Sequence, residues 1–231
     1  MGFKRLFALA TLVFAPLTHA AFVTIDEPSL DAIYSQATFG ANTVDIRIGP
    51  VTVFVRPDLL DITTNAQINA IFALHVGPQD IVNFYFVDTI SACGATISTG
   101  IIGCGETPGQ DFVVESVFAA NTSIPSGGNI TIAAQLLAHE LGHNLGLPHR
   151  TGNFLMNPSI NGFGALNAAE VSTILASPLV HMDANGQRFV QINPVLITAV
   201  PEPSSLAFTA AGLALVGFIV RRRRPAPAQR A

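Results

Sequence analysis

Hydrophobic residues recur with a period of two in some segments of the chain and with a helical period in others. Residues 44–48 and 51–55 alternate apolar and polar side chains on either side of Gly49-Pro50, which predicts two strands around a turn. Residues 81–87 form an unbroken apolar and aromatic run, which is typical of a buried strand. Residues 111–117 are also predicted to form a strand. We therefore expect a sheet with at least one strand in its interior.

Apolar residues at helical spacing predict three helices among these strands. Each is preceded by a hydroxyl or amide side chain that can cap its first turn. The predicted helices begin at Thr63 or Thr64, at Asn129 and at Asn167, and they end at Gly77-Pro78, at Leu145 and at Ser177-Pro178. Residues 21–40 are expected to add a short turn or helix that packs on the domain. His75, in the last turn of the first helix, is interpreted as a helix-end residue.

The N-terminal residues have the order of a secretory signal peptide. Lys4 and Arg5 precede an apolar run over residues 6–17, and Thr18 and Ala20 supply small residues. This order predicts cleavage by signal peptidase after Ala20, within a segment 1–20. The alternative, an N-terminal membrane anchor, is disfavoured because the apolar run is too short to span a bilayer.

The C-terminal residues 200–231 carry a second targeting pattern. Pro201-Glu202-Pro203 precedes an apolar segment, 204–220, and four arginines follow at 221–224. The segment is near the lower length limit for a transmembrane helix, and the arginines would stay cytoplasmic. This order resembles the PEP-CTERM sorting signal of Gram-negative bacteria. The resemblance implies transient anchoring in the inner membrane facing the periplasm, processing by an exosortase, and delivery to the cell surface or extracellular matrix. A tail anchor that is never removed is the alternative.

The charge of the domain between these ends, residues 21–199, is strongly negative. It contains fourteen acidic residues and four arginines, so its net charge is about −10. Such a surface repels nucleic acid and anionic lipid headgroups, and no nucleic-acid partner is expected.

One motif within this domain carries chemistry, H-E-x-x-H-x-x-G-x-x-H. Residues four apart lie above one another on a helix, so His139 and His143 direct two imidazoles to one point. Gly146 can take the left-handed conformation that ends a helix, and the resulting turn would return His149 as a third ligand. Glu140 lies one position round from the first ligand, where its carboxylate could reach a metal-activated water. Three protein ligands with one open position are typical of a catalytic zinc site. The alternative is a helix with incidental surface histidines.

These residues resemble the metzincin clan of zinc endopeptidases, and the Leu-Gly-Leu-Pro-His ending is most similar to its matrixin and bacterial secreted branches. Met156, within residues 154–158, resembles the Met-turn that lies beneath the metal in that clan. The resemblance implies an α+β zincin fold with an α/β-type N-terminal subdomain: a twisted mixed sheet with helices on one side and an antiparallel edge strand, a long active-site helix, and a C-terminal helix. It also implies peptide hydrolysis with one zinc ion held by the three histidines and with Glu140 as general base.

The resemblance further implies which segments border the substrate. In metzincins the strand before the active-site helix is the antiparallel edge of the sheet, which assigns substrate pairing to residues 111–117, in particular Phe112, Val113 and Val114. An ordinary inner strand is the alternative. Residues 152–164 would form a wall of the pocket for the side chain after the cut. Arg150 departs from the residues that the named subfamilies tend to carry after the third histidine, which leaves the subfamily open.

Two other segments have competing interpretations. Residues 91–110 are rich in Gly and Thr and contain the only cysteines, Cys93 and Cys104, so we predict a loop stapled by a disulfide. Thiolate metal ligands are the alternative, disfavoured because the histidines already complete a site. Residues 183–186 could be taken for a calcium loop, but Asn185-Gly186 favours a hairpin turn.

Two functions from other classes compete with a protease. One is a surface or matrix protein with a structural zinc site, and the other is a metal-sequestering protein. The presence of Glu140 favours the enzyme, since neither alternative requires a base beside its first ligand.

Overall fold

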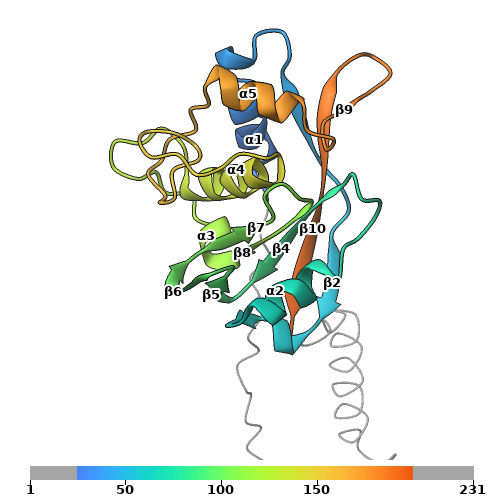
Figure 1. Ribbon diagram of the computed structural model, residues 1–231, viewed down its shortest axis with the longest axis vertical. Helices are drawn as coiled ribbons and strands as arrows, with labels where there is room; N and C mark the ends of the chain where they lie inside the picture. The colour runs from blue at the N-terminus through green and yellow to red at the C-terminus, as the bar shows by residue number, and fades with distance from the viewer. Residues whose placement is uncertain (1–24, 200–231) are drawn as a thin grey trace, which may run out of the picture. The chain divides into compact units, whose positions relative to one another are not determined.

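This computed structural model describes residues 25–199, which form a mixture of helices and strands (Figure 1). The elements are α1 (Glu27–Tyr34), β1 (Val44–Ile48), β2 (Thr52–Val55), β3 (Asp61–Ile62), α2 (Asn65–Phe72), β4 (Val82–Val87), β5 (Thr89–Cys93), β6 (Thr96–Ile101), β7 (Gly103–Gly105), β8 (Asp111–Glu115), α3 (Ser116–Ala119), α4 (Ile132–Asn144), α5 (Ala168–Leu175), β9 (His181–Met182) and β10 (Arg188–Thr198), with short 3-10 helices at Ala37–Phe39 and Pro57–Leu59. The predicted signal peptide and the predicted C-terminal membrane helix lie outside the described residues. Within those residues, every helix is too short or too polar to cross a membrane.

The main sheet is mixed and is organised around its longest strand, β10. The strand order is β1-β10-β4-β8-β7, and β2 also pairs with β10. The predicted strands 44–48 and 51–55 are confirmed, but they do not pair with each other. Both run parallel to β10, β1 beside residues 188–192 and β2 beside residues 195–198. Of the main strands only β7 is antiparallel to its neighbour, β8, and the short β9 forms a hairpin with β10.

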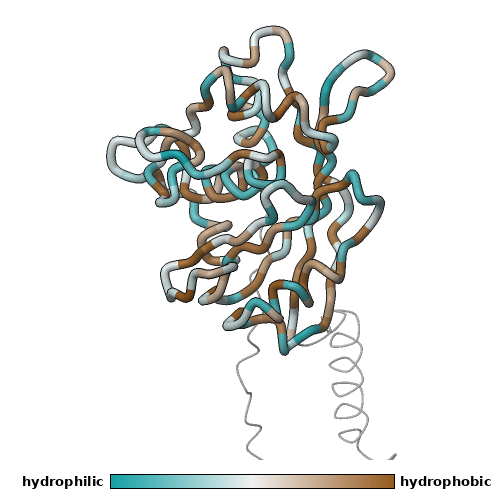
Figure 2. The backbone as a smooth tube through the Cα atoms, in the orientation of Figure 1, coloured by the Kyte–Doolittle hydropathy of each residue, from teal (hydrophilic) through white to brown (hydrophobic). Residues whose placement is uncertain are grey.

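Helices cover both faces of this sheet. As a result, β4 is buried on both sides, as its unbroken apolar run predicted. Phe84 and Phe86 contact the larger core, which α1, α4 and α5 complete. Tyr85 and Val87 point to the opposite face, where they pack against the smaller core under α2. Figure 2 shows the corresponding hydrophobic stretches along the strands. The fold is therefore α+β, and the expectation of helices on one side only is wrong.

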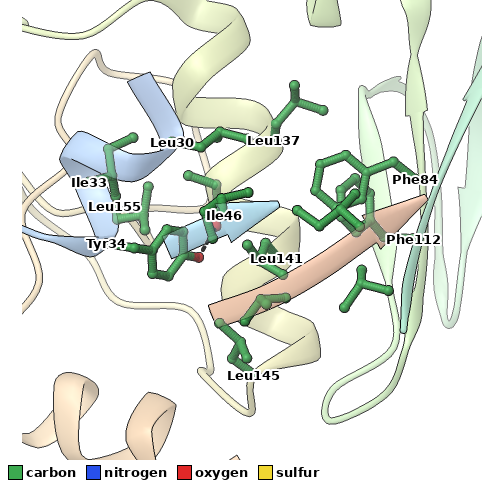
Figure 3. Close-up of a cluster of buried hydrophobic side chains, with 14 of the residues drawn as sticks. Leu30, Ile33, Tyr34, Ile46, Phe84, Phe112, Leu137, Leu141, Leu145 and Leu155 are labelled. Carbon is green, nitrogen blue, oxygen red and sulfur yellow. Dashed lines mark hydrogen bonds between the residues drawn. The ribbon is translucent and has the colours of Figure 1, made fainter. Parts of the chain in front are cut away.

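Helix α4 is the central element of the larger core. Its residues from Ala133 to Asn144 are all buried, as expected for a helix enclosed by other elements. The hydroxyl of Tyr34 on α1 donates to the carbonyl of Ala138 at 2.8 Å, and leucines of α4 pack against both helix α1 and the sheet (Figure 3). The helix begins at Ile132, two residues later than the predicted cap at Asn129 implies. Thr131 is the cap, accepting from the backbone N–H of Ala134 at 3.1 Å, whereas the N–H of Asn129 donates to Gly162.

The other two predicted caps and the hairpin turn predicted at residues 183–186 are confirmed. Thr64 and Asn167 each form a capping box, with Gln67 and Glu170 respectively. The hairpin turn before β10 is closed by the N–H of Gly186, which donates to the carbonyl of Asp183 at 3.0 Å.

The segment 91–110 differs from the predicted loop. It contains the hairpin β5–β6 and the strand β7, and β5 and β6 form a small second sheet with β3. Its Gly and Thr residues gave a weak strand signal because glycine carries no side chain to pack on a sheet. The predicted disulfide is confirmed, and the Cα atoms of Cys93 and Cys104 are 5.8 Å apart.

Candidate metal centre

The end of α4 brings the three histidines of the motif together. His139 and His143 project from one side of the helix. Gly146 follows with φ of 96°, a conformation that favours glycine, and the N–H of Leu147 donates to the carbonyl of Gly142 at 2.9 Å. The chain then reverses and places His149 opposite the helix, as the sequence predicted.

The histidine ring nitrogens converge on one point. One ligand atom from each of the three residues lies within 4.8 Å of the other two. The Nε2 atoms of His143 and His149 are 3.1 Å apart, and the centroids of the His139 and His143 rings are 4.7 Å apart. A single ion between three such nitrogens would be within coordination distance of all of them.

Backbone carbonyls fix which nitrogen of each helical histidine faces this point. The Nδ1 of His139 donates to the carbonyl of Leu155 at 2.9 Å, and the Nδ1 of His143 donates to that of Leu147 at 2.8 Å. Because a carbonyl only accepts, Nδ1 carries the proton and Nε2 presents a lone pair. Neighbouring lone pairs repel unless a cation lies between them, so the donor set fits a metal such as zinc.

The histidines are also held in the neutral form that binds a metal. Burial lowers the pKa of His139 to about 4, an effect that the Leu155 carbonyl opposes and that the other two rings strengthen. Burial likewise lowers the pKa of His143 and of His149. At neutral pH the three imidazoles are therefore unprotonated and available as ligands.

Met156, within residues 154–158, packs directly against helix α4 at Gly142. The side chain is fully buried, and a Cβ at Gly142 would be 2.5 Å from its Sδ. Helix α4 can approach Met156 this closely only because position 142 has no side chain. The same segment supplies the Leu155 carbonyl that orients His139.

The chain after the third histidine is anchored on both sides. The N–H of Arg150 donates to the carbonyl of Met156 at 2.8 Å. Its guanidinium lies 3.4 Å from the centroid of the Phe154 ring and pairs with Glu170 of α5 at 3.4 Å. These contacts hold the residue that directly follows His149.

Glu140 lies beside the histidines, against strand β7. The side chain is only 5% exposed, and this burial raises the pKa of its carboxyl group to about 8. Its oxygens face the bare Cα atoms of Gly103 and Gly105. Sequence reasoning did not identify these glycines, because nothing along the chain relates them to the motif.

Two hollows meet at Glu140 and His149. The first, of about 400 Å³, lies between residues 100–103 and residues 157–160, with His139 at its base. The second, of about 350 Å³, continues past Gly105 and Thr107. Together they form a cleft that runs along strand β7 on both sides of the histidines.

The strand that borders this cleft is β7 and not β8. The sequence assigned the antiparallel edge to Phe112, Val113 and Val114, but β8 pairs with β4 on one side and with β7 on the other. All five residues of β8 are buried. The assignment is therefore wrong, and the alternative of an inner strand is correct. Strand β7 has β8 as its only strand partner among residues 25–199.

Comparison with known proteins identifies one feature of the chain. Residues 199–224 match the family described as the PEP-CTERM protein-sorting motif. The motif implies an exported protein that is sorted to the cell surface, and it implies recognition by an exosortase-type processing enzyme. No curated protein and no solved structure matches the chain.

Proposed function

We propose that the chain is an exported zinc-dependent endopeptidase with a metzincin-like fold. The observation that carries the proposal is the convergence of three histidine nitrogens beside a buried carboxyl group at the border of a cleft, with the Nδ1 atoms of His139 and His143 bonded to carbonyls so that their Nε2 atoms present lone pairs. A structural zinc site is usually closed by four protein ligands, whereas three ligands leave a position for a reactant.

The proposed reaction divides the work between the metal and the protein. His139, His143 and His149 would hold a zinc ion, which supplies Lewis-acid polarisation of a carbonyl and a lowered pKa for a water molecule. The charge of a bound zinc ion would oppose the effect of burial on the pKa of Glu140 and favour its carboxylate form. The carboxylate would accept a proton from the attacking water and pass it to the leaving amine. Residues Leu155 and Leu147 hold two of the imidazoles in the productive orientation through their carbonyls.

The substrate would lie along β7, as a strand added to the edge of the sheet. Successive residues of a strand point their backbone groups to opposite sides. The carbonyl of Ile102 and the N–H of Glu106 bond to β8, so the backbone groups of Gly103 and Gly105 face the other way. They are available to an extended peptide. The hollow beside residues 157–160 would then receive the side chain that follows the cut.

Isolated zinc-loaded protein tests this function. The full-length chain is incubated with casein beside two variants, Glu140→Gln and His143→Ala. Glu140→Gln keeps the shape and the zinc but removes the base, and we expect cleavage to fall by a factor of about 10² to 10⁴. His143→Ala should lose both zinc and cleavage.

The same experiment separates the enzyme from its alternatives. Equal cleavage by the wild type and Glu140→Gln would assign the activity to a contaminant. Zinc binding without cleavage of casein or of a peptide library would instead support a structural or metal-sequestering surface protein.

Sorting is tested separately. We propose that the precursor is anchored in the inner membrane facing the periplasm and is then released to the surface or matrix. Mass analysis of surface-released protein should show a chain without residues 206–231. An intact tail on that protein would support a permanent anchor.

A further inference from the structure

Strand β7 makes an unusually close approach to the carboxylate of Glu140. A Cβ atom at position 103 would overlap Oε1 of Glu140 and would lie 2.7 Å from Cδ and 3.0 Å from Cγ. Real Cβ atoms essentially never come within 3.0 Å of another heavy atom, so only glycine is compatible with the observed place of this side chain. The close contact thus involves the carboxylate of Glu140 and not only its Cγ.

We propose that Gly103 is a positioning residue for Glu140. Its missing side chain makes the space in which the carboxylate lies between the edge strand and the three histidines. The inference deepens the proposed function and rests on it for its catalytic consequence, but the packing it describes can be measured without any substrate.

The strand cannot move away to make room for a side chain. On one side β7 is held by β8, where the N–H of Glu115 donates to the carbonyl of Ile102 at 2.9 Å. On the face opposite Glu140, Cys104 joins the smaller core and is bonded to Cys93. The amide of Asn144, beside His143, donates to the carbonyl of Glu106 at 3.1 Å and so ties the end of the strand to α4.

Glu140 is the part that would move instead. Its carboxylate ends a flexible side chain, so rotation relieves the overlap at a modest cost in stability. Strand β7 closes one side of the carboxylate, and the hollow that contains His139 and His149 is open beside it. A side chain at position 103 would therefore push the Glu140 carboxylate toward the metal centre and away from its observed position beside β7.

Neighbouring glycines provide a graded series of controls. A Cβ at Gly105 would be 3.2 Å from Oε2 of Glu140 and 3.1 Å from the Cβ of Phe112, which is tight but can be accommodated by small shifts. A Cβ at Gly100 would have only the Ser98 hydroxyl near it, at 3.6 Å. Substitution to alanine should therefore disturb Glu140 strongly at 103, weakly at 105 and not at 100.

The first experiment compares Gly103→Ala, Gly105→Ala and Gly100→Ala in the full-length, zinc-loaded chain. We expect Gly103→Ala to keep its zinc and to lower Tm by less than about 4 °C, while kcat for a peptide falls about a hundredfold with little change in KM. Gly105→Ala should lose less, and Gly100→Ala should keep wild-type Tm and zinc content. Parallel loss of zinc, Tm and activity in Gly103→Ala would reduce Gly103 to a structural residue and overturn the proposal.

Two further backgrounds test the coupling. In Glu140→Gln, adding Gly103→Ala should produce no further loss of activity, because the displaced group is already inactive. In Cys93→Ala/Cys104→Ala, the released strand can yield, so Gly103→Ala should cost less than tenfold in kcat. A full hundredfold loss in either background would contradict the proposal.

A spectroscopic measurement does not depend on proteolysis. With Co²⁺ in place of zinc, movement of Glu140 toward the metal should change the visible absorption spectrum of Gly103→Ala, while Gly100→Ala keeps the wild-type spectrum. If the wild type cleaves nothing but Gly103→Ala alone shows the spectral change, the proposed function fails and the positioning survives. If the two spectra are the same, Gly103 does not position Glu140.

Discussion

Buried histidines lie on both sides of the main sheet, and their surroundings differ in one respect. On the side of α4, the Nδ1 atoms of His139 and His143 are bonded to carbonyls while their Nε2 atoms face a third ring. On the side of α2, both nitrogens of His75 have their own partners, Asp111 at 2.9 Å and the carbonyl of Pro78 at 3.0 Å. The Nε2 atoms of His139 and His143 are therefore acceptors without a donor, whereas both ring nitrogens of His75 are hydrogen-bonded.

The titration of the two sites follows this difference. Burial lowers the pKa of His139 and, acting alone, would lower that of His75 as well. For His75 the hydrogen bond to Asp111, the Pro78 carbonyl and the negative charges nearby outweigh burial, so its pKa is raised. Two acceptors thus favour the protonated form of His75, whereas burial favours the neutral form of the histidines of α4. Burial of a histidine does not distinguish these roles, but the partners of its second nitrogen do.

The largest expected effect is stabilisation by zinc, which should appear on the α4 side only. Zinc at about a thousand times its Kd should add about 4 kcal/mol to the free energy of unfolding, which raises Tm by roughly 10 °C. His143→Ala should lose this shift, and His75→Ala should keep it. Thermal unfolding with zinc and with a chelator measures both, and an equal shift in the two variants would remove the distinction between the sites.

A smaller loss should come from breaking the ion pair on the α2 side. The side chains of His75 and Asp111 are only 9% and 3% exposed, so removal of one leaves the other buried without its partner. We expect His75→Ala to cost about 3 kcal/mol of unfolding free energy, measured by urea denaturation of the metal-free chain. A cost below about 1 kcal/mol would show that water replaces the missing ring.

Substitution of Gly142 at its contact with Met156 should cost about 2 kcal/mol of unfolding free energy. Gly142→Ala places a methyl group against Met156, and either α4 or the segment 154–158 must shift. The shift separates His139 from the Leu155 carbonyl, so zinc affinity should fall together with stability. The combination Gly142→Ala with Met156→Ala is the matched control, because removal of the thioether opens the space again. If zinc affinity stays low in the double variant, the close contact is not the cause.

The sequence predicted those parts of the site that depend on spacing within one helix and the turn that follows. His139, His143, Gly146 and His149 are close in sequence, so helix geometry and the glycine turn placed them. Met156 was singled out by the resemblance of residues 154–158 to the Met-turn of metzincins.

The cleft border was not predictable, because it depends on pairing between distant segments. Phe112 to Val114 look like a strand, and β-branched and aromatic residues favour strands at an edge as well as inside. Gly103 and Gly105 look like a loop, and their strand exists only because β8 pairs with it and the disulfide holds it. Similarly, the parallel pairing of β1 and β2 with β10 joins residues more than a hundred positions apart.

The smallest predicted effect is a pH dependence of stability that arises at His75 and Asp111. Burial raises the pKa of Asp111 to about 6, against the opposing effect of His75, and the pKa of His75 is also raised. A group whose pKa is higher in the folded than in the unfolded state stabilises the fold below its unfolded value, and this contribution is lost as the pH rises through the folded value.

Both groups therefore lower the free energy of unfolding as the pH rises from about 4 to 8. Because other groups titrate in the same range, the useful quantity is the difference between the wild type and Asp111→Asn in the metal-free chain. We expect the advantage of the wild type to shrink by on the order of 1 kcal/mol over this interval. Glu106, whose charge acts on both residues, is present in both proteins and cancels. A difference that stays constant or grows with pH would show that folding does not raise the pKa values of His75 and Asp111.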